Sequence, residues 1–116
     1  MTTHWPATPD LPGATASIPP EDFKILLVHT PDFAPQAARA GIQLQLSGHS
    51  HGGQIRLPGI GALYRPPLGR EYPSGLQQVS GSGTLVYTNC GLGTTVLPLR
   101  LFCPPEVTLL TLRSRA

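Results

Sequence analysis

The residues of this chain best suited to chemistry are histidines, and two of them lie one residue apart. His49 and His51 occur in the stretch LSGHSHGGQ, from Leu46 to Gln54, directly after an apolar run. Neutral imidazole is the commonest metal ligand in proteins. Flanking glycines let the backbone approach an ion without an intervening Cβ. The spacing therefore fits a metal site, and it also fits a polar, solvated loop.

The elements that must position these histidines form a predicted strand–helix–strand unit. The apolar run Ile25–Val28 predicts a short buried strand. The stretch Pro31–Gly41 predicts a helix, with Asp32 as its N-terminal cap. Apolar residues alternate with glutamines from Ile42 to Leu46, which predicts a second strand with one buried face. A βαβ unit implies a parallel strand pair and a right-handed crossover.

This topology brings the histidines to one edge of the sheet. Ligands of open α/β sheets bind where the carboxyl ends of parallel strands converge. His29 ends the first predicted strand, and His49 and His51 follow the second, so we expect all three along that edge. If His29 is considered by itself, an alternative interpretation is a strand-end residue whose side chain forms hydrogen bonds with nearby backbone. His4 lies in the proline-rich segment at the amino terminus, residues 1–19, and no role is assigned to it.

Later segments predict mostly antiparallel structure. Residues 74–80 and 84–89 predict a hairpin around a Gly-Ser-Gly turn. Residues 106–112 predict a final buried strand. The Pro/Gly-rich stretch Leu57–Pro73 predicts an irregular excursion with short strand pieces at most. With Arg56, Tyr64, Arg65 and Arg70 it could border a substrate pocket, and an exposed loop is the alternative.

The first 19 residues are rich in proline and small polar residues. They predict an irregular leader that contributes nothing to a core, and a disordered segment would explain them as well.

Composition narrows the classes of partner. The 116 residues suffice for one domain. Net charge is +2 and the basic residues are scattered, whereas nucleic-acid binding requires a concentrated basic face, so no nucleic acid is expected. No segment approaches the ~20 apolar residues of a membrane span. No signal peptide is visible, so the expected location is the cytoplasm.

The two cysteines, Cys90 and Cys103, are too few for a disulfide framework and lack the paired spacing of a zinc knuckle. Two small, partly buried side chains are the favoured interpretation. A single disulfide between them remains open.

The residues alone give three imidazole ligands and no convincing carboxylate. A catalytic metal site requires at least three protein ligands and an open position. Asp32 is occupied if it caps the helix, and the glutamates have no motif context. The chain has neither a nucleophile elbow nor a phosphate-binding loop, so no catalytic residue is assigned.

Three longer stretches carry a family resemblance: ILLVHTPDFAPQAARAGIQLQLSGHSHGGQIRLP, YPSGL and NCGLGTTVLPLRLFCPPEVTLLTL. Together they resemble the carboxyl-terminal half of the calcineurin-like metallophosphoesterases, in the bacterial branch with a Gly-His-Thr/Ser-His-Gly-Gly-Gln motif. The resemblance covers about Pro20 to Leu112. It implies an α/β fold, part of a four-layer αββα sandwich, in which a βαβ unit is followed by mostly antiparallel strands. Residues 20–116 would form that half-domain, preceded by the leader 1–19.

The resemblance also implies a function. Family members hydrolyse phosphodiester, phosphomonoester or pyrophosphate bonds with two divalent ions, commonly Mn, Fe, Zn or Mg. By the motif, His29 and His49 would bind the second metal and His51 the first. The substrate would be a small-molecule or lipid-linked phosphate ester. Peripheral membrane association is an option for the full-length family.

One departure from the family is large. Its amino-terminal motifs, Asp-x-His, Gly-Asp-x-x-Asp and Gly-Asn-His-Asp/Glu, do not occur here. We therefore expect a fragment: a truncated gene, a misplaced start, or a separately encoded half, with apolar faces and sheet edges exposed. The alternatives to a phosphoesterase are a non-catalytic remnant, a weak metal-binding module, or half of a split enzyme that requires an amino-terminal partner chain.

Overall fold

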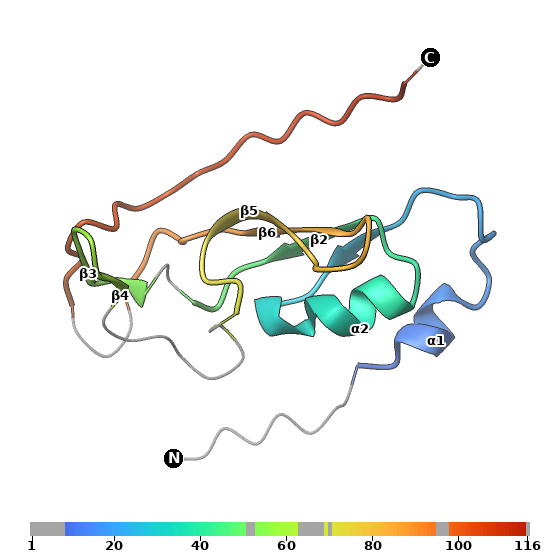
Figure 1. Ribbon diagram of the computed structural model, residues 1–116, viewed down its shortest axis with the longest axis horizontal. Coiled ribbons are helices and arrows are strands. Elements are labelled where there is room, and N and C mark those ends of the chain that lie inside the picture. Colours follow the sequence, from blue (N-terminus) through green and yellow to red (C-terminus); the bar gives the residue numbers. More distant parts are fainter. Residues whose placement is uncertain (1–8, 51–52, 63–68, 70, 95–97, 116) are drawn as a thin grey trace.

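Four strands form one mixed sheet with helices on one of its faces (Figure 1). The computed structural model describes residues 9–50, 53–62, 69, 71–94 and 98–115. The sheet has the order β1-β2-β6-β5, with β1 at Ile25–Leu27, β2 at Leu44–Ser47, β5 at Gly75–Gln78 and β6 at Leu85–Thr88. The helices are α1 (Leu11–Thr15), the 3₁₀ helix η1 (Pro31–Phe33) and α2 (Ala34–Arg39). Two short strands, β3 (Arg56–Leu57) and β4 (Gly61–Ala62), form a separate hairpin.

The pairing confirms the predicted βαβ unit. Strands β1 and β2 are parallel, with Ile25 opposite Leu44. The predicted hairpin is also present, because β5 and β6 are antiparallel around a turn in which Gly81 has a φ of 72°. Strand β6 additionally runs parallel to β2, so the neighbouring strands β1, β2 and β6 are parallel, while β5 pairs with β6, and β3 with β4, in the antiparallel sense that was predicted for the later segments.

The start of α2 differs from the prediction. Asp32 lies inside η1 and does not cap the helix, whose N-terminal flanking residue is Phe33. Its Oδ1 instead accepts the backbone N–H groups of Glu71 and Tyr72, at 3.0 and 3.3 Å. The prediction was wrong because the 3₁₀ turn directs this carboxylate toward another segment of the chain.

Small side chains let α2 pack closely on the sheet. Ala34 is fully buried against Val79 and Val86. Helix α1 also reaches this side, because Leu11 is buried beside Ala37 and Ile42. The prediction that residues 1–19 contribute nothing to a core is therefore wrong for Leu11, and residues 1–8 lie outside the described residues.

The two predicted strands of the βαβ unit are in place, and their burial was predicted correctly only in part. Ile42 and Leu44 are buried as predicted, at 3% and 5% exposure. Ile25 and Leu27 are 47% and 78% exposed, whereas Gln45 is fully buried. The register puts Gln45 on the side that faces α2. There its Nε2 donates to the carbonyl of Pro31 at 3.1 Å and to Ser47 Oγ at 2.9 Å.

The predicted strand at residues 106–112 is absent, since residues 103–115 are extended but belong to no strand. The segment runs across the sheet face opposite the helices (Figure 1). Leu110 and Leu112 line a hollow of about 410 Å³ with Phe23 and Leu44, while Leu109 is 91% exposed. A strand needs a neighbouring strand edge, and this segment crosses a face instead. No helix within the described ranges is long and apolar enough to span a bilayer.

Candidate functional site

Two of the three candidate histidines meet at the carboxyl edge of the parallel strands. His29 follows β1 by two residues and His49 follows β2 by two residues. His49 Nδ1 lies 3.1 Å from His29 Nε2, and the ring centroids are 4.9 Å apart at an interplanar angle of 72°. The expectation that these two share one edge is confirmed. His51 lies outside the described residues.

Backbone hydrogen bonds continue beyond the strand ends and hold the two loops together. The N–H of Val28 donates to the carbonyl of Leu46 at 3.2 Å, and the N–H of Gly48 donates to that of His29 at 3.1 Å. From the other side, the N–H of Asn89 donates to Ser47 at 2.9 Å. The main chain, rather than the side chains alone, therefore positions the imidazoles.

His49 occupies a backbone conformation that few non-glycine residues adopt. Its φ is 64°, and the N–H of Ser50 donates to the carbonyl of Gly48 at 2.7 Å across it, which makes His49 the centre of a γ-turn. Left-handed backbone at a non-glycine residue costs about 1–3 kcal/mol. The surrounding bonds maintain this strain and thereby fix where the ring of His49 projects.

A second segment braces the histidine loop. Ser50 is buried, and its Oγ donates to the carbonyl of Pro73. The adjoining residues Glu71 and Tyr72 are held by the carboxylate of Asp32. Burial, then the negative charges of Glu71 and Asp32, raise the pKa of Tyr72, so its phenol stays protonated at neutral pH. Sequence reasoning missed this brace, although a small hydroxyl residue between two histidines was a signal for it.

The chain beyond the motif is anchored to the segment that precedes Cys103. Gln54 is buried with a φ of 56°, and its carbonyl accepts the N–H of Leu101 at 3.0 Å. The N–H of Arg56 in turn donates to the carbonyl of Leu101 at 2.8 Å. Gln54 therefore holds the end of the histidine loop through its main chain.

The geometry of the imidazole pair is compatible with one shared metal ion. Two nitrogens that each bind an ion at about 2.0–2.1 Å, at angles between octahedral and tetrahedral, are about 2.9–3.4 Å apart. The observed separation of 3.1 Å falls within that range. Among the described residues, no group of three or more His, Cys, Asp or Glu side chains could hold a metal ion. The pair can therefore supply two ligands of a site but not a complete one.

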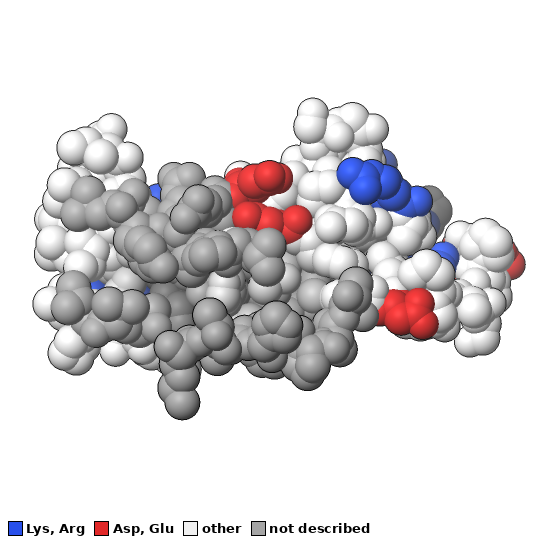
Figure 2. All heavy atoms as spheres, turned by 90° about the horizontal axis from the view of Figure 1, so that it is seen from below, with Lys and Arg blue, Asp and Glu red and all other residues white. Residues whose placement is uncertain are grey.

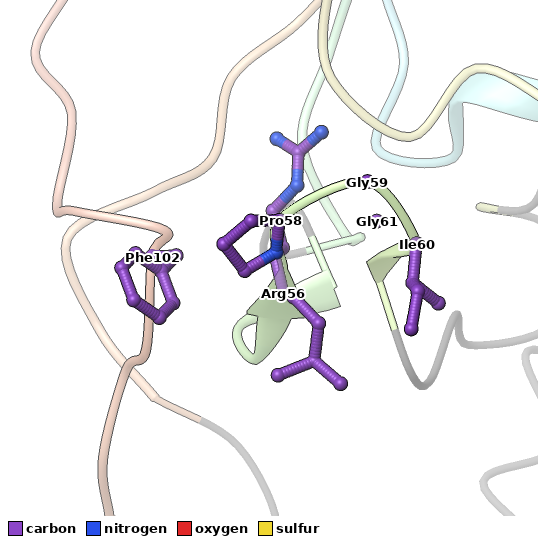
Figure 3. A pocket seen from close by; sticks show the side chains of 7 residues that line it. Arg56, Pro58, Gly59, Ile60, Gly61 and Phe102 are labelled. Carbon is purple, nitrogen blue, oxygen red and sulfur yellow. The ribbon is translucent and has the colours of Figure 1, made fainter.

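A shallow hollow of about 460 Å³ lies at the β3–β4 hairpin, which follows Gln54 closely in the sequence. Its lining residues are Arg56, Leu57, Pro58, Gly59, Ile60, Gly61 and Phe102. Figure 3 shows the ring of Phe102 beside Pro58, with Ile60 on the opposite side. Of the residues predicted to border a pocket, Arg56 and Leu57 line this hollow. Its other candidates, Tyr64, Arg65 and Arg70, lie outside the described residues.

Among the described residues on the side that carries the helices, charged side chains form small, separate acidic and basic groups between uncharged residues (Figure 2).

Known proteins resemble nearly the whole chain. The uncharacterized metallophosphoesterase YkuE of Bacillus subtilis is 48% identical over 106 residues, which are 91% of this chain and 36% of YkuE. The chain is a metallophosphoesterase homologue. Phosphodiesterase YaeI of Escherichia coli is 36% identical over 101 residues, 87% of this chain and 35% of YaeI. A transmembrane protein with metallophosphoesterase domain from Bos taurus is 37% identical over 107 residues, 90% of this chain and 23% of that protein.

The homology is partial in extent, because the chain spans about one-third of the length of YkuE and YaeI. No protein family model matches the chain. No solved structure matches it either.

Proposed function

We propose that this chain supplies part of the di-metal centre of a calcineurin-like phosphoesterase. In this proposal His29 and His49 bind one divalent ion and His51 binds the second. The observation that carries it is the 3.1 Å approach of His49 Nδ1 to His29 Nε2 at the carboxyl edge of the sheet. Homology to metallophosphoesterases over most of the chain supports the same assignment.

A pair of divalent ions, Mn, Fe, Zn or Mg, would supply Lewis acidity toward a phosphoryl oxygen and an activated water. The chain's own part is positional. Its γ-turn fixes His49, the hydrogen bond from Gly48 to His29 joins the two loops, and Ser50 ties them to residue 73. Imidazole binds metal only when neutral, so protonation of the pair in acid would oppose binding.

The complete centre requires ligands beyond those described. In our proposal they come from polypeptide outside these 116 residues, either in one longer chain or in a partner chain of a split enzyme. The assembled domain would be the four-layer αββα sandwich. Its reaction would be hydrolysis of a phosphate ester, small-molecule or lipid-linked, and the name of YaeI makes phosphodiesters the first class to test.

The metal assignment is tested by titrating the purified chain with Mn²⁺ and measuring bound metal after dialysis. Wild-type protein should bind Mn²⁺, and His49→Ala and His29→Ala should each weaken binding at least ~10-fold. His4→Ala is the matched control, since it removes an imidazole that the proposal does not use. Equal binding by the wild type and both site variants would refute the assignment.

A non-catalytic metal-binding module is the second candidate, favoured by the absence of a third ligand among the described residues. A chromogenic phosphodiester with Mn²⁺ separates the two. Metal retention without turnover by this chain fits an incomplete centre or a binding module, and turnover restored by an added amino-terminal half of a relative would identify the former. Robust turnover by the chain alone, lost in His49→Ala, would show that its own ligands suffice.

A further inference from the structure

Two buried cysteines lie next to each other although twelve residues separate them in the sequence. Cys90 follows β6 by two residues, and Cys103 lies at the start of the extended carboxyl-terminal segment. Both are buried and reduced. The proposed function gives them no role.

A single guanidinium joins the backbones of the two cysteines. Arg100 Nη2 donates to the carbonyl of Cys90 at 2.5 Å, and Arg100 Nη1 donates to that of Cys103 at 3.1 Å. Because both nitrogens belong to one planar group, the two carbonyls are held within the width of one side chain. A disulfide requires such an approach, with Cα atoms usually about 4.4–6.8 Å apart.

The two thiols also face one another, in different electrostatic surroundings. Burial, the nearby Cys103 and Glu106, and hydrogen bonds to both raise the pKa of the Cys90 thiol to about 12. Arg100 Nη1 also donates a hydrogen bond to Cys103 Sγ at 3.6 Å, so the guanidinium contacts the sulfur of this residue as well as its carbonyl. On this contact Cys103 is assigned as the attacking thiol, while Cys90, whose pKa is raised chiefly by burial, keeps its proton at neutral pH.

We propose that Cys90 and Cys103 are a redox modification site that closes reversibly into an intramolecular disulfide by exchange with a small-molecule disulfide such as glutathione disulfide. The Cys103 thiolate attacks one glutathione sulfur, which forms a mixed disulfide and releases a glutathione thiolate. That thiolate takes the proton of Cys90. The Cys90 sulfur then attacks Cys103 Sγ and expels the second glutathione. Two protein thiols are oxidised, and one glutathione disulfide is reduced to two thiols.

The disulfide would lock the two segments that flank the histidine loop. On one side, the N–H of Asn89, the residue before Cys90, donates to Ser47. On the other, Leu101 is bonded to Gln54 and Arg56. Oxidation therefore ties together both anchors of the loop that carries His49, and the expected consequence is slower opening of residues 48–50 and 53–55.

The test is equilibration of the full chain in glutathione redox buffers, followed by acid quenching, alkylation with excess iodoacetamide in urea at about pH 8, where the unfolded thiols are accessible and ionise, and intact mass measurement. Reduced protein should take two alkyl groups. Oxidised protein should take none and should lose the mass of two hydrogen atoms. The midpoint is the ratio of the glutathione disulfide concentration to the square of the glutathione concentration at which half of the protein is oxidised. This ratio should be about 10-fold lower for the native chain than for the same chain in urea, because the fold has already brought the thiols together.

Cys90→Ser and Cys103→Ser are the matched controls, since each can take up only one glutathione. Arg100→Lys keeps the charge but not the two-carbonyl bridge, and it should move the native midpoint toward the urea value. The proposal is overturned if native protein in excess glutathione disulfide keeps two alkylatable thiols or carries glutathione on both cysteines. An oxidation midpoint equal to that in urea overturns it as well. Unchanged amide hydrogen exchange of residues 48–50 and 53–55 after oxidation would overturn the coupling to the histidine loop.

Discussion

The two faces of the four-stranded sheet have opposite relations between polarity and burial. On the helix face, which carries Gln45, Val86 and Thr88, all three side chains are fully buried. On the open face, which carries Ile25, Leu27, Leu76 and Leu85, the exposed fractions run from 37% to 78%. A glutamine is thus inside while these four apolar side chains are outside, although Leu44 on the same open face is only 5% exposed. The comparison teaches that coverage by other elements, rather than side-chain polarity, decides burial here.

A contiguous apolar surface of this kind usually marks a place where other polypeptide binds. The exposed apolar face expected of a partial phosphoesterase domain is confirmed by these leucines. Among the described elements only the carboxyl-terminal segment crosses the open face. It lines a hollow together with Leu44 and Leu76, and Leu27 and Leu76 remain exposed. The aligned region covers only about one-third of the homologous proteins YkuE and YaeI, so in those proteins further polypeptide accompanies it.

The largest expected effect contrasts one aspartate on each face. Val86→Asp would bury an unpaired carboxylate against α2 and should cost about 4 kcal/mol or more of the free energy of unfolding. Leu27→Asp should change it by less than about 0.5 kcal/mol. Urea denaturation followed by circular dichroism measures both. Equal destabilisation by the two variants would show that Leu27 is covered in solution and would abolish the contrast.

Association should depend on the open face alone. The double variant Leu27→Lys with Leu76→Lys should weaken concentration-dependent self-association at least ~10-fold, about 1.4 kcal/mol, because it breaks the apolar surface with two charges. Sedimentation velocity over a concentration series gives the association constant. Arg39→Ala, at the end of α2 on the other side of the sheet, is the control and should leave it unchanged.

His49 lies at the carboxyl edge of the sheet in a strained backbone conformation, and the free-energy cost of that conformation can be measured. His49→Gly should be about 1 kcal/mol more stable than His49→Ala, because glycine adopts a φ of 64° without a Cβ clash. Both variants lack the imidazole and should lose Mn²⁺ binding equally. If chemical denaturation finds the alanine variant at least as stable, the γ-turn at residue 49 does not store strain.

The smallest expected effect concerns the hydrogen bonds of Glu106, which link the carboxyl-terminal segment to Tyr87 on the open face. Hydrogen bonds from the hydroxyls of Thr108 and Tyr87 lower the pKa of Glu106 below its usual 4.5. Because the folded pKa is depressed, this contribution to stability is fully present above pH 4.5 and is lost as the pH falls through the lower, folded-state value. Glu106→Gln should therefore show a slightly flatter loss of stability in acid than the wild type. Parallel slopes in urea titrations between about pH 6 and about pH 3 would contradict this role.

The sequence by itself determined the local elements and the family. The βαβ unit, the hairpin around residues 81–83 and the meeting of His29 with His49 were all predictable, because strand periodicity, glycine turns and parallel topology act over short stretches of chain. The motif around His49 and the stretches after it likewise indicated a metallophosphoesterase, which the homology to YkuE supports.

Only the tertiary structure decided which partners those elements have. Asp32 bonds to residues 71 and 72 instead of its own helix, and Arg100 joins Cys90 to Cys103. The exposure of Leu27 follows in the same way from which element covers which face of the sheet. Each of these outcomes depends on how separate elements and loops pack together, and a pattern within one segment contains no information about what will pack against it.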